Sequence, residues 1–99
     1  MLVYVEPTIE KFNKYIADGS IGKKIDAMLS AAKPEAIYFT NNNGRRSWIM
    51  IVDVPKSSAV PSIAEPFFLQ LDAKVEFHIC MTPEDLGNAG LDEIGKKWG

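Results

Sequence analysis

Three residues of the last predicted strand, Glu76, His78 and Cys80, have side chains that can do chemistry. Apolar and polar residues alternate in segment 74–81, which predicts a strand with these three side chains on one face, about 6.5–7 Å apart. Carboxylate, imidazole and thiol groups transfer protons or bind transition metals. A structural zinc usually takes four ligands, and the chain has a single histidine and a single cysteine, so we predict no metal site, although two copies could complete one. The alternative interpretation is a structural row in which His78 pairs with Glu76 or with a cross-strand neighbour.

Glu65 is a second candidate for acid–base chemistry because it precedes Pro66 in a predicted helix. Proline removes a helical hydrogen bond, so we expect a kink or an early end that frees the carbonyl of Ser62. A kink at this point could open a pocket between the helix and the sheet, with Glu65 as a base. The alternative is a surface glutamate near a helix end. His78 and Glu65 are therefore the catalytic candidates.

Aromatic and basic side chains around a predicted hairpin are candidates for ligand binding. Tyr38 and Trp48 flank the hairpin, and such side chains line ligand pockets as readily as they fill cores and dimer interfaces. Arg45 and Arg46 end the turn, where they could hold a carboxylate or phosphate, remain in solvent or pair with acids of a partner chain. We select Tyr38, Trp48 and Arg46, together with Glu76, as candidate ligand-binding residues.

The composition limits the classes of function. The chain has 99 residues, 46% of them hydrophobic, which suits a single domain over residues 1–99. Its 11 basic and 13 acidic residues give a net charge of −2, so no nucleic acid partner is expected. One cysteine cannot form a disulfide within the chain, the first residues lack a signal-peptide pattern, and no apolar run reaches the roughly 18–20 residues that span a bilayer. We expect a cytoplasmic protein without a membrane partner. The chain has no glycine-rich phosphate loop and no Cys-x-x-Cys pair, and we predict no cofactor.

Periodicity and turn signals define the elements that must position these residues. Strands are predicted at 2–6, 35–40, 46–54 and 74–81, and helices at 8–32 and from Ser57 or Ser58 to about residue 68. Two glycines in 18–22 predict a kink or short break in the first helix. Asn43-Gly44 predicts a tight hairpin turn. A short helix begins at Thr82, and Leu91, Ile94 and Trp98 repeat at helical spacing in a tail that could lie across an edge or clasp a partner.

The order strand, helix, strand, strand, helix, strand indicates an α+β fold. The simplest arrangement is a ferredoxin-like β-α-β-β-α-β antiparallel sheet with the helices on one face, followed by an extra C-terminal helical tail. The other face would carry Glu76, His78 and Cys80 beside apolar side chains of the central hairpin, which is too mixed a surface to be left in solvent. We expect a second copy to cover it, so that two sheets form a dimeric α+β barrel.

Several short motifs spread over nearly the whole chain carry a resemblance to a known family. They are 33–36 with 38–40, the turn 43–46, 64–66 with 68–69, 75–77 and 81–86. With these motifs the chain resembles a family of small uncharacterised bacterial proteins that is similar to the dimeric α+β barrel superfamily. That superfamily includes muconolactone isomerase-like proteins and antibiotic-biosynthesis-type monooxygenases. The resemblance implies the fold and a homodimer, and no catalytic residue is carried over from it.

Three functions remain open from the sequence. The first is a homodimer that binds a small apolar or aromatic molecule inside the barrel or between helices and sheet. The second is an isomerase or a cofactor-free monooxygenase-like enzyme that uses His78 or Glu65 as acid or base. The third is a structural or regulatory interaction domain whose tail, ending near Trp98, docks on another chain.

Overall fold

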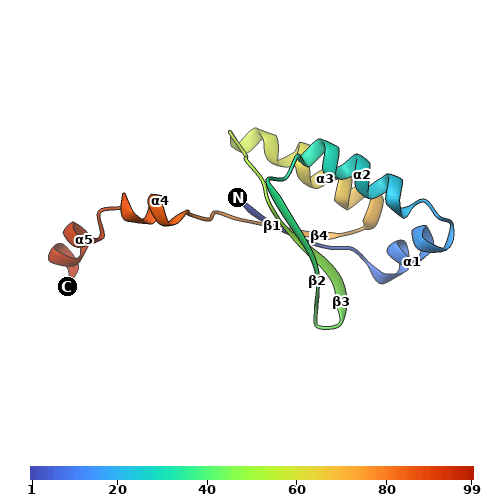
Figure 1. Ribbon diagram of the computed structural model, residues 1–99, viewed down its shortest axis with the longest axis horizontal. Helices are drawn as coiled ribbons and strands as arrows, with labels where there is room; N and C mark the ends of the chain where they lie inside the picture. The colour runs from blue at the N-terminus through green and yellow to red at the C-terminus, as the bar shows by residue number, and fades with distance from the viewer.

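A computed structural model describes residues 1–99, and it is an α+β structure with one sheet (Figure 1). The strands are β1 (Leu2–Glu6), β2 (Ala36–Asn42), β3 (Arg45–Ile51) and β4 (Lys74–His78). The helices are α1 (Ile9–Ala17), α2 (Ile21–Ala32), α3 (Val60–Leu71), α4 (Pro83–Gly87) and α5 (Leu91–Trp98), with a single 3-10 turn at Ser57–Ala59 before α3.

The four strands form an antiparallel sheet in the order β2-β3-β1-β4, so the two central strands are β3 and β1. The register pairs Tyr4 with Ile49 on β3 and with Glu76 on β4. Because side chains alternate across a strand, this register assigns every strand residue to one of two faces. Val3 and Val5 of β1 are fully buried on the face that packs against the helices.

Helices α1, α2 and α3 lie on one side of the sheet, and the core lies between them and the strands (Figure 1). Its largest buried side chain is Trp48 of β3, whose ring is 6.5 Å from that of Phe12, 5.6 Å from that of Phe39 and 5.9 Å from that of Phe67. The rest of the buried core consists of aliphatic side chains and two methionines from β1, β3, α2 and α3 and from the residues just after β3 and α3. Aromatic rings packed at such tilted angles add about 0.5–1.5 kcal/mol per pair beyond the area they bury.

The break predicted within the first helix is confirmed. Helix α1 ends at Ala17, and Gly19 takes a positive φ of 78° that reverses the chain before α2 begins at Ile21. Asp18 stabilises the turn, because its carboxylate accepts hydrogen bonds from the amide and the hydroxyl of Ser20 at 2.9 and 2.6 Å. These two bonds lower the pKa of Asp18.

The hairpin predicted from Asn43-Gly44 is confirmed as well. Strand β2 ends at Asn42 and β3 begins at Arg45, which leaves a loop of two residues. Asn43 and Gly44 have φ values of 52° and 78°. A two-residue turn in which both residues have positive φ is type I′, and its twist matches that of the flanking strands.

Three predicted ends of elements are wrong by three residues, while the other boundaries differ by no more than about two. Strand β3 ends at Ile51 instead of continuing to Val54, and the chain then leaves the sheet toward Pro55. Helix α3 runs through Pro66 to Leu71, because Ile63, Phe67 and Leu71 bury one helical face and their packing outweighs one missing hydrogen bond. Strand β4 ends at His78, so Cys80 lies outside the strand and does not extend its row of side chains.

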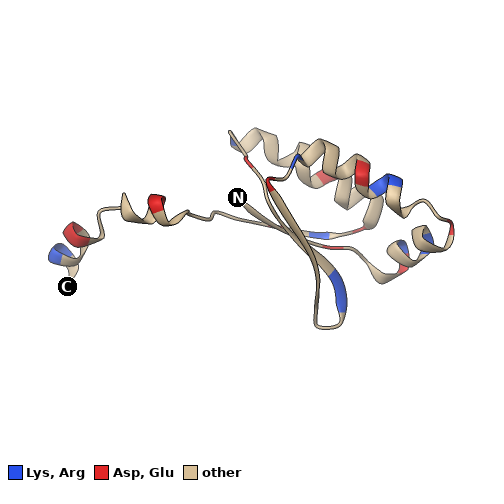
Figure 2. Cartoon of the chain, viewed as in Figure 1, with Lys and Arg blue, Asp and Glu red and all other residues tan.

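The last segment, which we call the arm (residues 79–99, with α4 and α5), extends away from the rest of the chain (Figure 1). Every residue of the arm is exposed. The arm makes the structure 59 Å long and raises its radius of gyration to 17.0 Å, against about 13 Å for a compact domain of this length. Acidic residues begin α5 and lysines end it, an order that suits the helix dipole (Figure 2). No helix has the length and apolar content needed to cross a membrane.

Candidate functional site

The sheet face turned away from the helices, which we call the open face, carries the candidate site. Alternation and register place side chains from all four strands on it: Leu2, Tyr4, Glu6, Ala36, Tyr38, Thr40, Asn42, Arg45, Ser47, Ile49, Ile51, Lys74, Glu76 and His78. Leu2, Ile49 and Ile51 are only half-buried, and Tyr38 is 67% exposed. The open face therefore combines an apolar centre with a polar surround, and nothing in this chain covers it.

A shallow hollow of about 420 Å³ occupies the middle of the open face. Its lining residues are Leu2, Tyr4, Thr40, Asn41, Asn42, Ser47, Ile49, Lys74, Glu76 and His78. The volume lies within the range of about 300–1,000 Å³ that is usual for small-molecule sites. The lining is richer in hydrogen-bonding groups than in apolar ones, so the hollow suits a molecule with polar substituents.

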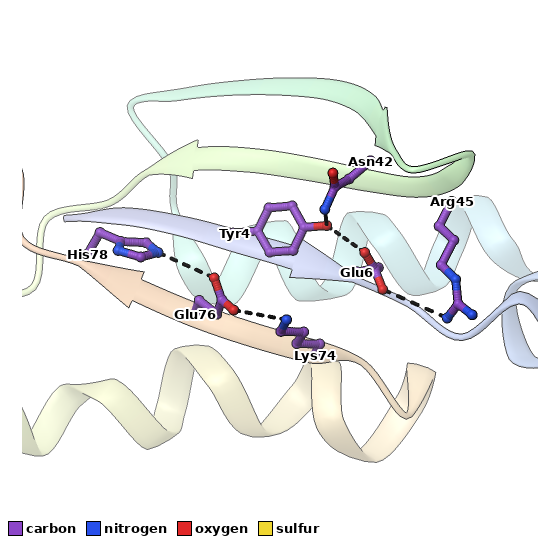
Figure 3. A network of polar contacts seen from close by, with 7 residues as sticks. All are labelled: Tyr4, Glu6, Asn42, Arg45, Lys74, Glu76 and His78. Carbon is purple, nitrogen blue, oxygen red and sulfur yellow. Dashed lines mark hydrogen bonds and ion pairs between the residues drawn. The ribbon is translucent and has the colours of Figure 1, made fainter.

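Glu76 is the centre of a charged row on β4 (Figure 3). Its Oε1 is 3.1 Å from Nζ of Lys74, and its Oε2 is 3.4 Å from Nε2 of His78. The hydrogen bond from Lys74, and after it the one from His78, lowers the pKa of Glu76, and the same contact with Glu76 raises the pKa of Lys74. Glu76 is therefore ionised near neutral pH and holds the imidazole of His78 by one nitrogen.

A second polar chain crosses the neighbouring strands (Figure 3). The hydroxyl of Tyr4 donates to Oε1 of Glu6 at 2.6 Å and accepts from Nδ2 of Asn42 at 3.1 Å. The other carboxylate oxygen of Glu6 is 4.0 Å from Nη1 of Arg45. These contacts fix the Tyr4 hydroxyl over the sheet and balance the charge of Glu6.

Ser47 provides the one buried polar group of the hollow that has no partner. Its side chain is 1% exposed, and its Oγ is buried without a hydrogen bond. A buried hydroxyl that is left unpaired costs roughly 1–3 kcal/mol, so a ligand or a water molecule that bonds to it would recover that energy.

The structure brings together two of the predicted site residues, Glu76 and His78, in the lining of the hollow. Tyr38 lies on the same open face, on the edge strand β2, but it does not line the hollow. Trp48 lies on the opposite face, inside the core. Arg46 also lies on that opposite face, where its Nη1 donates to Oδ1 of Asn13 at 2.9 Å and its guanidinium lies 4.7 Å from the ring centre of Phe12.

Glu65 and Cys80 are placed apart from the hollow. Glu65 is exposed on α3, and the pocket expected between helix and sheet beside it is absent because α3 stays packed on the core. A groove does form next to Pro66, but it lies between α2 and α3, and Glu65 does not line it. Cys80 is exposed beyond the end of β4.

Sequence reasoning missed Tyr4, Asn42 and Ser47 in the hollow. Tyr4 shares the alternation of β1 with Leu2 and Glu6, which is a signal in the sequence once the sheet order is known. Asn42 lies outside the predicted strands, and Ser47 lies within the predicted strand 46–54 with no signal that marks it as a site residue. Only the register of β2 against β3 and of β3 against β1 brings these three groups beside Glu76.

His78 and Cys80 are the side chains of this region that most readily bind transition metals. No group of three or more His, Cys, Asp and Glu side chains is arranged to hold a metal ion.

In comparisons with known proteins, no protein-family model matches this chain, and no curated protein matches it.

Proposed function

We propose that the protein is a homodimer that binds a small molecule between two copies of its sheet. The observation that carries this proposal is the hollow on an open face whose apolar residues, Leu2, Ile49 and Ile51, have no cover within the chain. A sheet with helices on one side must shield its other side to remove such apolar surface from water. A second copy offers the same surface, and two-fold pairing is the commonest form of oligomer.

The proposal also specifies the type of α+β fold. In this assignment the unit is ferredoxin-like and two units form a dimeric α+β barrel, with the two sheets about 10 Å apart face to face. Support comes from the antiparallel sheet with helices α1 to α3 on one side and from the sequence resemblance described above. The two shallow hollows would then face each other and form one enclosed cavity.

The ligand that fits best is a small molecule with an apolar body and hydrogen-bonding groups. Leu2 and Ile49 provide apolar contact, and Ser47, Tyr4 and Asn42 provide hydrogen-bonding groups. Glu76 and Glu6 are each paired with a base, so the site has little excess charge. This narrows the apolar or aromatic ligand expected from the sequence to one that also carries polar groups.

Sedimentation velocity and light scattering test the pairing. We expect a mass of about twice the 11.0 kDa chain at micromolar concentration. Ile49→Lys places a charge in the centre of the open face and should yield a monomer, because an unpaired charge in an interface core is strongly unfavourable. Leu69→Lys is the matched control, since Leu69 is 74% exposed on α3 and lies outside the open face. A wild-type monomer, or a dimer that Ile49→Lys leaves intact, would contradict the proposal.

Binding is tested with defined probes by NMR of the ¹⁵N-labelled protein. Phenol, benzoate and imidazole present a neutral, an anionic and a basic ring, each with hydrogen-bonding groups. We expect at least one to shift the amide signals of Ser47 and Ile49, and a Ser47→Ala variant to bind it more weakly. Shifts confined to other parts of the chain, or none up to millimolar concentration, would contradict a ligand site in the hollow.

A second candidate function is acid–base catalysis by His78, favoured by the contact of its Nε2 with Glu76 at 3.4 Å inside the hollow. A carboxylate that holds one imidazole nitrogen orients the ring and leaves the other nitrogen free to take or give a proton. In this version the enzyme is of the isomerase or cofactor-free monooxygenase-like type. Glu65 is too remote from the hollow to share the work. His78→Ala should abolish turnover of any substrate that the hollow binds, while His78→Gln should preserve binding.

A further inference from the structure

The arm exposes an apolar stripe that nothing in its own chain covers. Leu91, Ile94 and Trp98 repeat along one side of α5, and they are 55%, 48% and 77% exposed. An isolated helix of eight residues is marginal in water, so most of its stability must come from packing of this stripe. Helix α5 therefore has the composition of a helix that docks into a groove.

The helical layer of the protein offers such a groove between α2 and α3. It has a volume of about 350 Å³ and an apolar floor that includes Ala27, Met28, Ala31 and Pro66. Ala27 and Ala31 are exposed and one helical turn apart, and small residues at this spacing let another helix approach closely. Lys23 and Lys24 line one end of the groove.

The charges of α5 and of the groove complement each other. Lys23 and Lys24 stand in the first turn of α2, which has no acidic residue, and the helix dipole adds positive charge there. Asp92 and Glu93 stand in the first turn of α5 (Figure 2). None of the ion pairs within the chain involves Lys23, Lys24 or Asp92. The ammonium group of Lys24 donates to Oε1 of Gln70 at 3.3 Å and lies 4.4 Å from the ring centre of Tyr15, so Lys23 is the less engaged of the two lysines.

The dimensions agree with a parallel arrangement of α5 and α2. With Asp92 beside Lys23 and Lys24, α5 runs along α2 toward Ala31, and both Leu91–Trp98 and 24–31 span about 11 Å of helix. Trp98 then reaches the end of the groove near Ala31. The arm extends away from the helical layer of its own chain (Figure 1), so the occupant comes from elsewhere.

We propose that α5 of one copy docks in the α2–α3 groove of a second copy, in both directions, so that the two arms clasp the dimer. The proposal rests on the homodimer proposed above. If two sheets pair about 10 Å apart, the helical layer of the partner lies roughly 20 Å from the sheet that the arm leaves. From His78 to the start of α5 at Leu91, the arm can span about 35 Å, from the rise of its extended and helical segments. A lipid surface fits less well, because the arm carries four acidic and two basic side chains.

The test uses full-length variants and two measurements, the dimer dissociation constant from sedimentation equilibrium and the quenching of tryptophan fluorescence by acrylamide. Trp98 is exposed in the single chain and Trp48 is 1% exposed, so a change in quenching reports on Trp98. We expect quenching to fall as the concentration rises through the dimer dissociation constant. Trp98→Ala should weaken the dimer roughly 30-fold, as is typical of a buried aromatic anchor.

Charge reversal tests the orientation. Lys23→Glu and Asp92→Lys should each weaken the dimer roughly fivefold to tenfold, and the double variant should recover most of that loss. Ala27→Leu fills the groove and should weaken the dimer, while Ala17→Leu on α1 is a matched control outside it. If the double variant fails to recover affinity, the proposed orientation is wrong. If, in addition, Trp98→Ala leaves the affinity of the dimer unchanged, the docking itself is wrong.

Two further outcomes separate this proposal from the pairing of the sheets. Quenching that does not depend on concentration would mean that α5 stays in solvent or docks on its own chain, and either result overturns the clasp. If Ile49→Lys abolishes the dimer while every arm and groove variant preserves it, the sheets pair and the clasp is wrong. If the arm and groove variants break the dimer while Ile49→Lys does not, the clasp holds and the pairing of sheets fails.

Discussion

Glu76 on β4 lies directly opposite Tyr4 on β1, and this register places the two polar chains of the open face side by side. On one side Glu76 accepts from Lys74 and His78, and on the other the Tyr4 hydroxyl bonds to Glu6 and Asn42. The charged groups of the face thus satisfy one another before any ligand arrives. A ligand that binds here can use the remaining capacity of these groups, the side chains of Thr40 and Asn41, and the buried hydroxyl of Ser47 if it becomes accessible.

The titration of Glu76 gives a direct check of this network. Lys74 first, and His78 second, hold the pKa of Glu76 below its ordinary value of 4.5. The unfolded chain lacks these contacts and titrates near the ordinary value. Because the folded-state pKa is the lower one, the contribution of Glu76 to stability is complete above pH 4.5 and is lost as the pH falls through the folded-state pKa.

Carbon-13 NMR of the Glu76 carboxyl group measures this pKa. The midpoint should lie below 4.5 in the wild type, move up in Lys74→Ala and move up by a smaller amount in His78→Ala. Lys96→Ala, which breaks the Lys96–Glu93 pair in the arm at 3.4 Å, should leave the midpoint unchanged. A wild-type midpoint at 4.5 would show that the contacts do not persist in solution.

Local signals predicted most of the elements. Alternation in 74–78, the turn residues Asn43-Gly44 and the glycine-containing break at 18–22 each depend on a few neighbouring residues, so they can be read without knowledge of the fold. The errors fall where tertiary packing decides. Helix α3 continues through Pro66 because Phe67 and Leu71 are held in the core, and no local signal announces that.

The site was harder to predict than the fold, because it depends on register. The alternation of β4 was enough to place Glu76 and His78 on one face. Alternation within β2 and within β3 does not by itself show whether Tyr38 and Trp48 share a face. Only the alignment of the two strands, in which Tyr38 pairs with Ile49, places them on opposite faces. Shifting a strand by one residue exchanges its faces, and a single sequence does not define that shift.

Two adjacent phenylalanines test where the core lies. Phe67 is 1% exposed and contacts the Trp48 ring, while Phe68 is 40% exposed on the other side of α3. Phe67→Ala removes a full ring from the core and should lower the free energy of unfolding by about 3–5 kcal/mol. Phe68→Ala should lower it by much less. Urea denaturation of both variants measures the difference, and equal losses would contradict the packing of α3 described above.

Two glycines with open space around them should respond to alanine with opposite signs. No atom lies within 4 Å of a Cβ added at Gly22 or at Gly44, so only the backbone conformation distinguishes them. Gly44 has a φ of 78° in the hairpin turn, and Gly44→Ala should destabilise by about 1–2 kcal/mol. Gly22 lies within α2, and Gly22→Ala should stabilise by about 0.5–1 kcal/mol. Thermal unfolding gives both values, and a gain from Gly44→Ala would mean that the turn is not type I′.

Two capping threonines distinguish the arm from the body. Thr8 caps α1, where its Oγ accepts from the amide of Lys11 at 3.4 Å and donates to the carbonyl of Leu71 at 3.2 Å. Thr82 caps α4, where its Oγ accepts from the amide of Asp85 at 3.1 Å. The amide of Thr82 in turn donates to the side-chain carboxylate of Asp85 at 3.0 Å. A lost cap usually costs about 0.5–2 kcal/mol.

The location of that cost should differ between the two variants. At concentrations where the chain is monomeric, Thr8→Ala should lower the free energy of global unfolding by about 1 kcal/mol, because α1 is joined to α3 through Leu71. Thr82→Ala should leave global unfolding unchanged and speed amide exchange only in α4, because the arm is exposed throughout and opens locally. Urea denaturation and hydrogen exchange measure the two effects. If Thr82→Ala lowers the free energy of global unfolding, the arm packs on the body of its own chain. In that case the arm is not available to contact a second copy.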